Sequence, residues 1–210
     1  MFLKQFSSVI VPLFILVPII IGLARYKVLP LNAKILWYYL LIAALISTSA
    51  TIIGRVYHAN NLPLLHLFTL IEGVIFIQFY KIEFNGNAKL YNLLSLTYII
   101  FCIVNAAFLQ SIHTYSSYTR YAESIICILF ALNYFAKIAT LDVRPLKLAS
   151  FHFNTGIFLY FSGSFILFIF SNVILQKLSA STLLLFWAGH SALVLIMYIF
   201  FSIGFSLCKK

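Results

Sequence analysis

The sequence is poor in charge, and poorest in acidic side chains. Only 9% of its 210 residues are charged, with four aspartates and glutamates against fourteen lysines and arginines. A soluble domain has about 25% charged residues, whereas here 63% are hydrophobic and the mean hydropathy is +1.06. A core folded in water cannot enclose so much apolar surface, so we expect lipid as the solvent. The lipid bilayer is therefore the first predicted partner.

Cysteine is also scarce, and the basic residues are dispersed. The three cysteines have no paired spacing, which excludes a disulfide framework and a CxxC metal site. We predict neither a metal nor a cofactor. The net charge of +10 comes from lysines and arginines spread one to three per loop. That pattern is typical of membrane topology signals and argues against nucleic acid as a partner.

Seven apolar runs fill the chain, and each is long enough to cross a hydrocarbon core of about 30 Å. They cover residues 6–24, 35–54, 63–80, 90–109, 118–139, 151–175 and 183–207. The predicted fold class is all-α: a polytopic integral membrane protein with a single seven-helix transmembrane domain over residues 1–210. The first run contains Pro12 and Pro18 and lacks a small-residue cleavage site, so we expect a retained helix with a kink at Pro18.

The lysine and arginine bias predicts the orientation. With the N-terminus outside, ten basic residues face the cytoplasm and four face outward. The inner ten are Arg25, Lys27, Lys34, Lys81, Lys89, Lys137, Arg144, Lys147, Lys209 and Lys210. The outer four are Lys4, Arg55, Arg120 and Lys177. We therefore predict an outer N-terminus, a cytoplasmic C-terminus and a multi-pass location in the cell membrane, with the bacterial inner membrane favoured.

The third run, residues 63–80, carries Glu72 roughly 14 Å from its outer edge, close to the bilayer midplane. An ionisable group at that depth costs at least about 2.5–3.5 kcal/mol on insertion scales. No basic residue lies one helical turn away, so its partner must come from another helix or from a ligand. Arg120, Asn105, His190 and the hydroxyl groups of residues 47–51 are the candidates by depth.

On the fifth run, Arg120 and Glu123 are i,i+3 neighbours, which predicts an ion pair that neutralises itself. The functional alternative is that Arg120 holds an anionic ligand or that Glu123 carries a proton. The strongly ionisable intramembrane groups all lie in the outer half, which predicts an outward-facing polar pocket. The candidates for a ligand or proton site are His66, Thr69, Glu72, Asn105, Arg120, Glu123 and His190. No catalytic residue is assigned.

Two motif interpretations fail on the residues themselves. Arg120-Tyr121-Ala122-Glu123 is similar to the Arg-Tyr-Ala-Asp segment of microbial rhodopsins, but the seventh run contains no lysine to hold retinal. Metal-dependent membrane hydrolases of the ceramidase type use an HxxxH pair at the last helix. Here Val194 stands four residues after His190, so only His66, His190 and a carboxylate remain as a three-ligand alternative.

Residues 60–72, 120–124 and 154–163 together resemble a family of uncharacterised seven-helix bacterial inner-membrane proteins. The resemblance supports the membrane location and implies no activity. The leading functional hypothesis is a ligand-binding or sensing module. Because the chain ends at Lys210 without an effector domain, we expect it to signal through another membrane or cytoplasmic protein. The alternatives are an intramembrane hydrolase or transferase acting on lipid, with Glu72 as base or metal ligand, and a proton-coupled transporter of small molecules.

Overall fold

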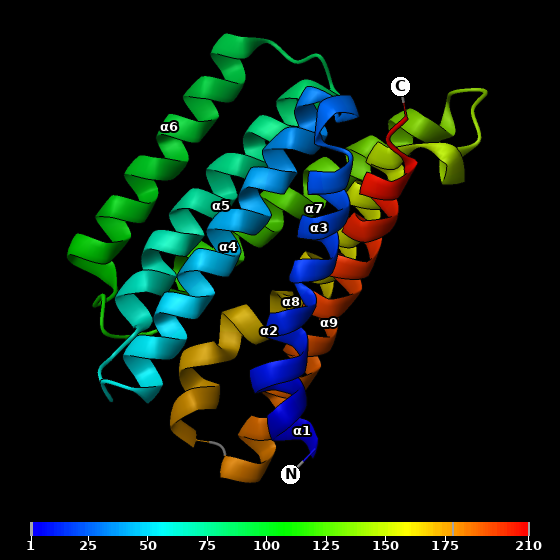
Figure 1. Cartoon of the computed structure of the whole chain (residues 1–210). Helices are drawn as coiled ribbons and strands as arrows, with labels where there is room; N and C mark the ends of the chain where they lie inside the picture. Colours follow the sequence, from blue (N-terminus) through cyan, green and yellow to red (C-terminus); the bar gives the residue numbers. More distant parts are fainter. Residues whose placement is uncertain (1, 178, 210) are drawn as a thin grey trace.

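The computed structural model describes residues 2–177 and 179–209, apart from the side chains of residues 170 and 172–177. Among these residues there is no strand, and seven helical spans are long and apolar enough to cross a membrane (Figure 1). The predicted all-α class and the seven helices are therefore confirmed. Two basic residues used for the orientation fall outside this description, Lys210 and the side chain of Lys177.

The spans follow the apolar runs closely. The first consists of α1 (Phe2–Gln5), the π-helical turn η1 (Phe6–Ile10), α2 (Val11–Phe14) and α3 (Leu16–Ala24). The others are α4 (Leu31–Arg55), α5 (Leu62–Glu83), α6 (Ala88–Val104) with the π-helical turn η3 (Asn105–Leu109), α7 (Ser117–Ala139), α8 (Ala149–Lys177) and α9 (Ala180–Leu207). Short 3-10 turns, Tyr26–Val28 and Pro145–Lys147, precede α4 and α8.

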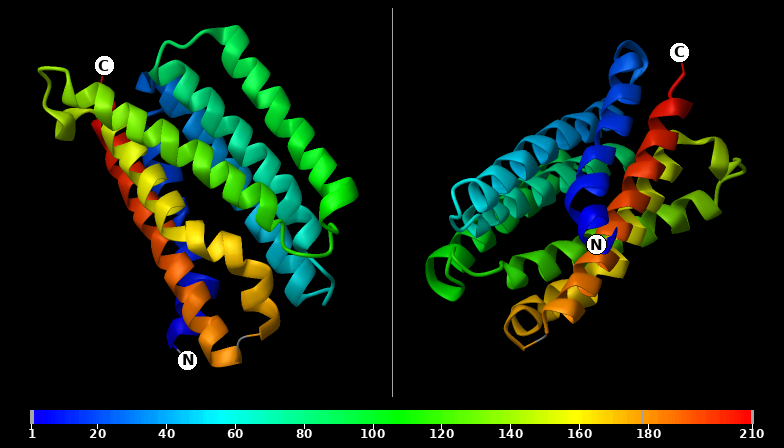
Figure 2. Two further views of the ribbon diagram at one scale, coloured as in Figure 1. Left: turned by 180° about the vertical axis from the view of Figure 1, so that it is seen from behind. Right: turned by 60° about the horizontal axis from the view of Figure 1, so that its bottom comes forward.

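Helix α5 lies in the interior of the bundle, where it contacts α4, α6 and α7. Helix α8 contacts α7 and α9, the first span packs against α9, and α6 lies at the outer edge on α5 (Figures 1 and 2). The N-terminus, the α4–α5 loop, the α6–α7 loop, the last turn of α8 and the first turn of α9 share one end of the bundle. We call it the N-terminal end; the C-terminus lies at the opposite, C-terminal end (Figure 1).

Both prolines disturb the first span, because proline has no N–H to donate to the carbonyl four residues earlier. The helix breaks at Ile15, between α2 and α3, three residues before Pro18, where the sequence predicts a kink. The π-helical turn before Pro12 was not predicted. Pro12 leaves the Ser8 carbonyl without its helical donor, and Arg55 Nη2 donates to that oxygen at 3.4 Å. This contact joins the first span to the end of α4.

Aromatic side chains fill the middle of the bundle. Phe76, Phe161 and Phe201 are fully buried, and their rings, together with Tyr39, lie 5.0–6.4 Å apart between centroids. Large apolar side chains also cover the outside, as Leu45 and Leu129 show with exposed fractions of 69% and 61%. An outer surface of this kind suits an apolar surrounding, and the seven spans suggest a multi-pass membrane protein.

A polar cluster fastens the C-terminal end. Asn32 of α4 and Ser150 of α8 both donate to Glu83 Oε1 at the end of α5, the serine at 2.8 Å. Lys137 of α7 donates to the Glu83 carbonyl at 2.7 Å. Glu83 is thus bonded to three helices distant in sequence. Nothing in the apolar pattern pointed to this cluster.

Gly73 should tolerate no larger residue. A Cβ atom there would lie 2.4 Å from the Tyr98 ring, and the Tyr98 hydroxyl group donates to the Thr69 carbonyl at 3.0 Å. We expect Gly73→Ala to lower the free energy of unfolding by about 1–3 kcal/mol, the usual cost of overpacking. Thermal unfolding in detergent measures this. Gly189→Ala is the control, since nothing lies within 4 Å of its added Cβ; equal effects of the two variants would contradict the close α5–α6 packing.

Candidate functional site

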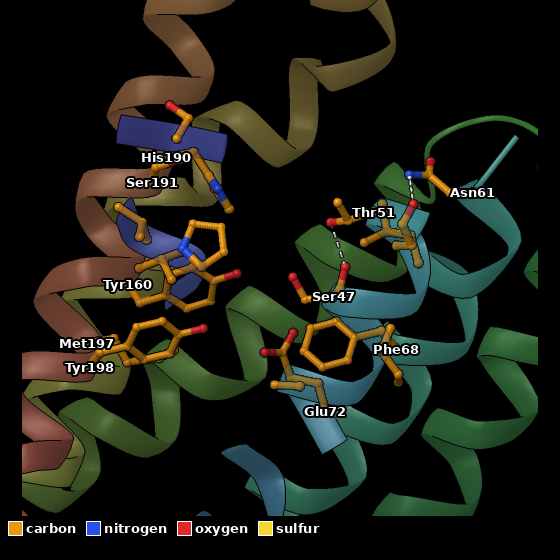
Figure 3. Close-up of a pocket in the computed structure, with 18 of the residues that line it drawn as sticks. Ser47, Thr51, Asn61, Phe68, Glu72, Tyr160, His190, Ser191, Met197 and Tyr198 are labelled. Atoms are coloured by element: carbon orange, nitrogen blue, oxygen red, sulfur yellow. Dashed lines mark hydrogen bonds between the residues drawn. The ribbon is translucent and has the colours of Figure 1, made fainter. Parts of the chain in front are cut away.

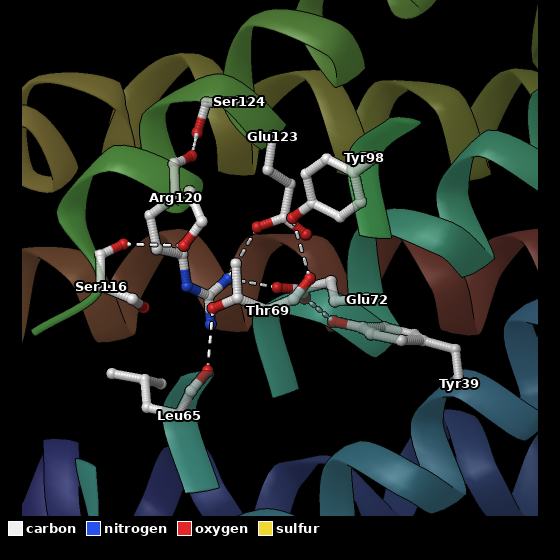
Figure 4. Close-up of polar contacts among 10 residues, drawn as sticks. Tyr39, Leu65, Thr69, Glu72, Tyr98, Ser116, Arg120, Glu123 and Ser124 are labelled. Carbon is white, nitrogen blue, oxygen red and sulfur yellow. Dashed lines mark hydrogen bonds and ion pairs between the residues drawn. The ribbon is translucent and has the colours of Figure 1, made fainter. Parts of the chain in front are cut away.

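Glu72 is completely buried, and both of its carboxylate oxygens are hydrogen-bonded by other helices. Tyr39 of α4 donates its hydroxyl hydrogen to Oε1 at 2.6 Å, and Arg120 Nη1 of α7 donates to Oε2 (Figure 4). A carboxylate near the midplane needs such partners, because burying an unpaired charge is costly. The prediction that Glu72 faces the bundle interior and meets polar groups of other helices is confirmed.

Arg120 bridges two glutamates rather than one. Its Nη1 donates to Glu72 and, at 3.3 Å, to Glu123 Oε2, and its side chain is only 4% exposed. The prediction of an isolated Arg120–Glu123 pair is therefore wrong: α5 and α7 pack side by side, so an arginine on α7 reaches a carboxylate on each helix. We call Glu72, Arg120 and Glu123 the triad.

Two aromatic rings pack against the Arg120 guanidinium group of the triad. The Arg120 guanidinium carbon lies 5.3 Å from the ring centroid of Phe68 and 5.4 Å from that of Phe168, within cation–π range. Thr69 is buried beside it, but its hydroxyl group donates to the Leu65 carbonyl at 2.9 Å. Such a bond to the preceding turn is common for threonine in a helix. Thr69 therefore shapes the site without a free polar group.

A cavity of about 380 Å³ extends from the N-terminal end of the bundle down to Glu72 and Arg120. Figure 3 shows α4 and α5 on one side of it and α8 and α9 on the other. Its polar lining comes from Ser7, Tyr39, Ser47, Thr51, Asn61, Glu72, Arg120, Tyr160, His190, Ser191 and Tyr198. A cavity of this volume lies in the usual range for small-molecule sites. Its walls are mixed, with aromatic rings between hydroxyl groups.

A second cavity, of about 460 Å³, adjoins the first, and Arg120 and His190 line both. Asn61, Leu62 and Leu65 are shared as well, while Tyr115 and Trp187 belong to the second cavity alone. Tyr115 lies in the loop before α7, and burial raises its pKa to about 12. Its phenol is therefore neutral at physiological pH, and Arg120 supplies the positive charge next to both cavities.

The other predicted site residues are distributed differently. Glu123 belongs to the triad but does not line either cavity. His66 Nε2 is hydrogen-bonded to the Thr114 carbonyl at 2.9 Å, away from the triad. Asn105 is buried in η3, and neither atom of its side-chain amide has a hydrogen-bond partner within the described part of the chain. His190 lines both cavities, and its ring lies 5.7 Å from that of Tyr160.

Three tyrosines that reasoning from sequence missed complete the site. Tyr39, Tyr160 and Tyr198 were not among the predicted site residues, and all three line the first cavity. Helix α8 begins at Ala149 and continues to Lys177, so Tyr160 lies near its middle, level with the triad. A tyrosine within an apolar run is a weak signal by itself, because such residues also pack in ordinary cores.

Among the described residues, no group of three histidines, cysteines, aspartates and glutamates is placed to hold a metal ion. The arrangement of His66, His190 and a carboxylate that the sequence left open is thus not formed. No protein-family model, curated protein or solved structure matches the chain. The resemblance to uncharacterised inner-membrane proteins therefore stays a prediction, and the function has to be inferred from the site.

The triad predicts unequal effects of two charge removals. Arg120→Gln leaves two buried glutamates without their cation and should cost about 3–5 kcal/mol of unfolding free energy. Glu123→Gln retains the Glu72–Arg120 pair, so we expect less than half of that loss. Thermal unfolding in detergent compares them, with Arg144→Gln in the exposed α7–α8 loop as the control. A larger loss for Glu123→Gln would mean that Glu123, not Glu72, is the main partner of Arg120.

Proposed function

We propose that the chain is a multi-pass protein of the cell membrane that binds a small molecule in the first cavity. It acts as a ligand-binding or sensing module. The observation that supports this most directly is that a cavity of about 380 Å³ ends at a buried charged triad. Concave sites with aromatic walls and a few convergent polar groups are typical of small-molecule binding.

The cavity does not continue as a polar path, and this favours a binding module over a carrier. Beyond Glu72 lie the buried rings of Phe76, Phe161 and Phe201. The Phe76 ring contacts those of Tyr39 and Phe161, and the Phe201 ring contacts that of Tyr39. A transported polar solute would have to displace this aromatic layer. A bound ligand needs only the N-terminal half of the bundle, where Thr51, Asn61 and Ser191 line the way to the triad.

The proposed orientation of the chain in the membrane rests on its basic residues. Nine described lysines and arginines fall at or near the C-terminal end. Because cytoplasmic loops carry an excess of these residues, we assign the C-terminal end to the cytoplasmic side. With that orientation the cavity lies in the outer half of the membrane. Ligand binding would then be signalled to a partner protein in the membrane or the cytoplasm.

A reporter fused to the C-terminus tests the orientation. We expect alkaline phosphatase at this position to be inactive and a fluorescent reporter that folds only in the cytoplasm to be bright. Fusions in the α6–α7 loop, at Ser111, should give the opposite result and serve as the control. Phosphatase activity at the C-terminus would reverse the topology and place the cavity on the cytoplasmic side.

Filling the cavity should abolish binding. Soluble compounds of about ten heavy atoms, in cationic, neutral and anionic forms, are screened for a rise in the unfolding temperature of the protein in detergent. We expect at least one charge class to stabilise the native chain and to have no effect on Ser47→Trp, which places an indole ring in the cavity.

The matched control is Leu45→Trp on the same helix, because Leu45 is 69% exposed on the outer surface and does not line the cavity. It should retain the stabilisation. If no class stabilises the native protein, or if Ser47→Trp responds as the native chain does, the first cavity is not a ligand site.

A further inference from the structure

The charges of the triad do not balance. Two carboxyl groups, Glu72 and Glu123, share the single guanidinium group of Arg120, and all three side chains are at most 4% exposed. With both glutamates ionised, the triad would carry one net negative charge in the middle of an apolar bundle. An uncompensated buried charge is strongly disfavoured.

The hydrogen bonds indicate where the missing positive charge is needed. Glu72 receives Tyr39 and Arg120, but within the described part of the chain no N–H or hydroxyl group donates to Glu123 Oε1, which is buried. The two carboxyl groups also contact each other (Figure 4). Two carboxyl groups can bond only when one of them carries a proton, as in other paired carboxyl sites.

The first cavity offers a second way to supply a positive charge. Glu72 lines it directly, and so do the rings of Tyr39, Phe68, Tyr160 and Tyr198. Aromatic faces attract cations, and a carboxylate beside them is the usual partner of an ammonium group. An anionic ligand would meet Arg120, whose Nη1 donates to both glutamates and whose Nε has no partner among the described residues. The two glutamates already outnumber this one positive charge, so an added anion would make the imbalance worse.

We propose that the ligand of the first cavity is a small organic cation, an alkyl- or arylammonium ion, and that it replaces one proton shared by Glu72 and Glu123. This inference rests on the proposed function and names the ligand class. On binding, the carboxyl O–H bond breaks, the proton leaves to solvent, and the ammonium group supplies the positive charge. The total charge of the buried site is unchanged by the exchange.

Other titratable groups surround the triad on every packed element that has one. They are Tyr39 of α4, Tyr98 and Cys102 of α6, Tyr115 of the loop, Cys127 of α7, Tyr160 of α8, and His190 and Tyr198 of α9. Phenols and thiols have ordinary pKa values of about 10 and 8.5, so both are neutral between pH 5.5 and 7.5. His190 is the one imidazole in this set and it lines both cavities, so the experiment has to separate it from the glutamates.

Isothermal titration calorimetry on the detergent-solubilised full chain provides the test, with three probes of one shape: 2-phenylethylammonium, 2-phenylethanol and phenylacetate. We expect the ammonium ion to bind at least about tenfold more tightly than the alcohol, and phenylacetate not to bind. Titrations in phosphate and MOPS buffers, which contain no primary ammonium group, count the protons released, and one should be released per ammonium ion bound. The dissociation constant of the ammonium ion should then fall about tenfold for each unit by which the pH rises.

Two variants show which residue the released proton comes from. In Glu123→Gln the release should vanish and the ammonium affinity should fall to that of the alcohol, which still binds. In His190→Gln the release should persist, and Asp142→Asn in an exposed loop should behave as the native chain.

Three outcomes would overturn the inference. Tightest binding of phenylacetate, or ammonium binding without proton release, would leave the ligand site intact and reject the exchange. Binding of none of the three probes would contradict the ammonium class as well as a cavity site for molecules of this size. The first two results need only the native protein, so they do not depend on whether a variant folds.

Discussion

The structure depends on one constraint: a carboxylate buried in the middle of an apolar bundle must be met by positive charge and by hydrogen bonds. Glu72 on α5 satisfies it with Arg120 of α7 and Tyr39 of α4. These bonds join α4, α5 and α7 next to the ring contacts of Tyr39 with Phe68 and Phe76. Because ring contacts are weakly directional while ion pairs and hydrogen bonds are not, the triad fixes how these helices lie relative to one another.

The two ends of the bundle are held differently, and this separates stability from function. At the C-terminal end, Glu83 is bonded to Asn32, Lys137 and Ser150, and it lines neither of the two cavities. Toward the N-terminal end, the polar groups line open space, and two cavities meet at Arg120 and His190. A polar cluster without space can only fasten helices together. A polar cluster beside a cavity can also bind a ligand in place of a proton or another bound group. For this reason we place the proposed function at the triad.

The sequence predicts the fold well because lipid-exposed helices obey a simple rule of length and apolarity. All seven spans follow from it, and the break before Pro18 follows from the N–H that proline lacks. The burial of Glu72 was also predictable from its depth. Arg120 was one of several candidate partners by depth, but its sharing between two glutamates was not predicted. The i,i+3 spacing favoured a local Arg120–Glu123 pair, while the packing of α5 against α7 lets one arginine contact a glutamate on each helix. The roles of Tyr39 and Tyr160 depend on rotation about the helix axes, which a nearly uniform apolar pattern does not specify.

Helix α9 connects the cavity to the opposite end of the molecule without interruption. It runs from Ala180 to Leu207 as one α-helix, carries His190, Met197 and Tyr198 on the cavity wall, and ends where the Cys208 carbonyl accepts a bond from Arg25 Nη1 at 3.0 Å. From His190 to Leu207 the rise is roughly 26 Å. If α9 tilts as a rigid helix by about 10° at His190, its end at Leu207 moves by about 4 Å. The hydrogen bond between Arg25 and the Cys208 carbonyl lies at this end, so such a tilt would change its length.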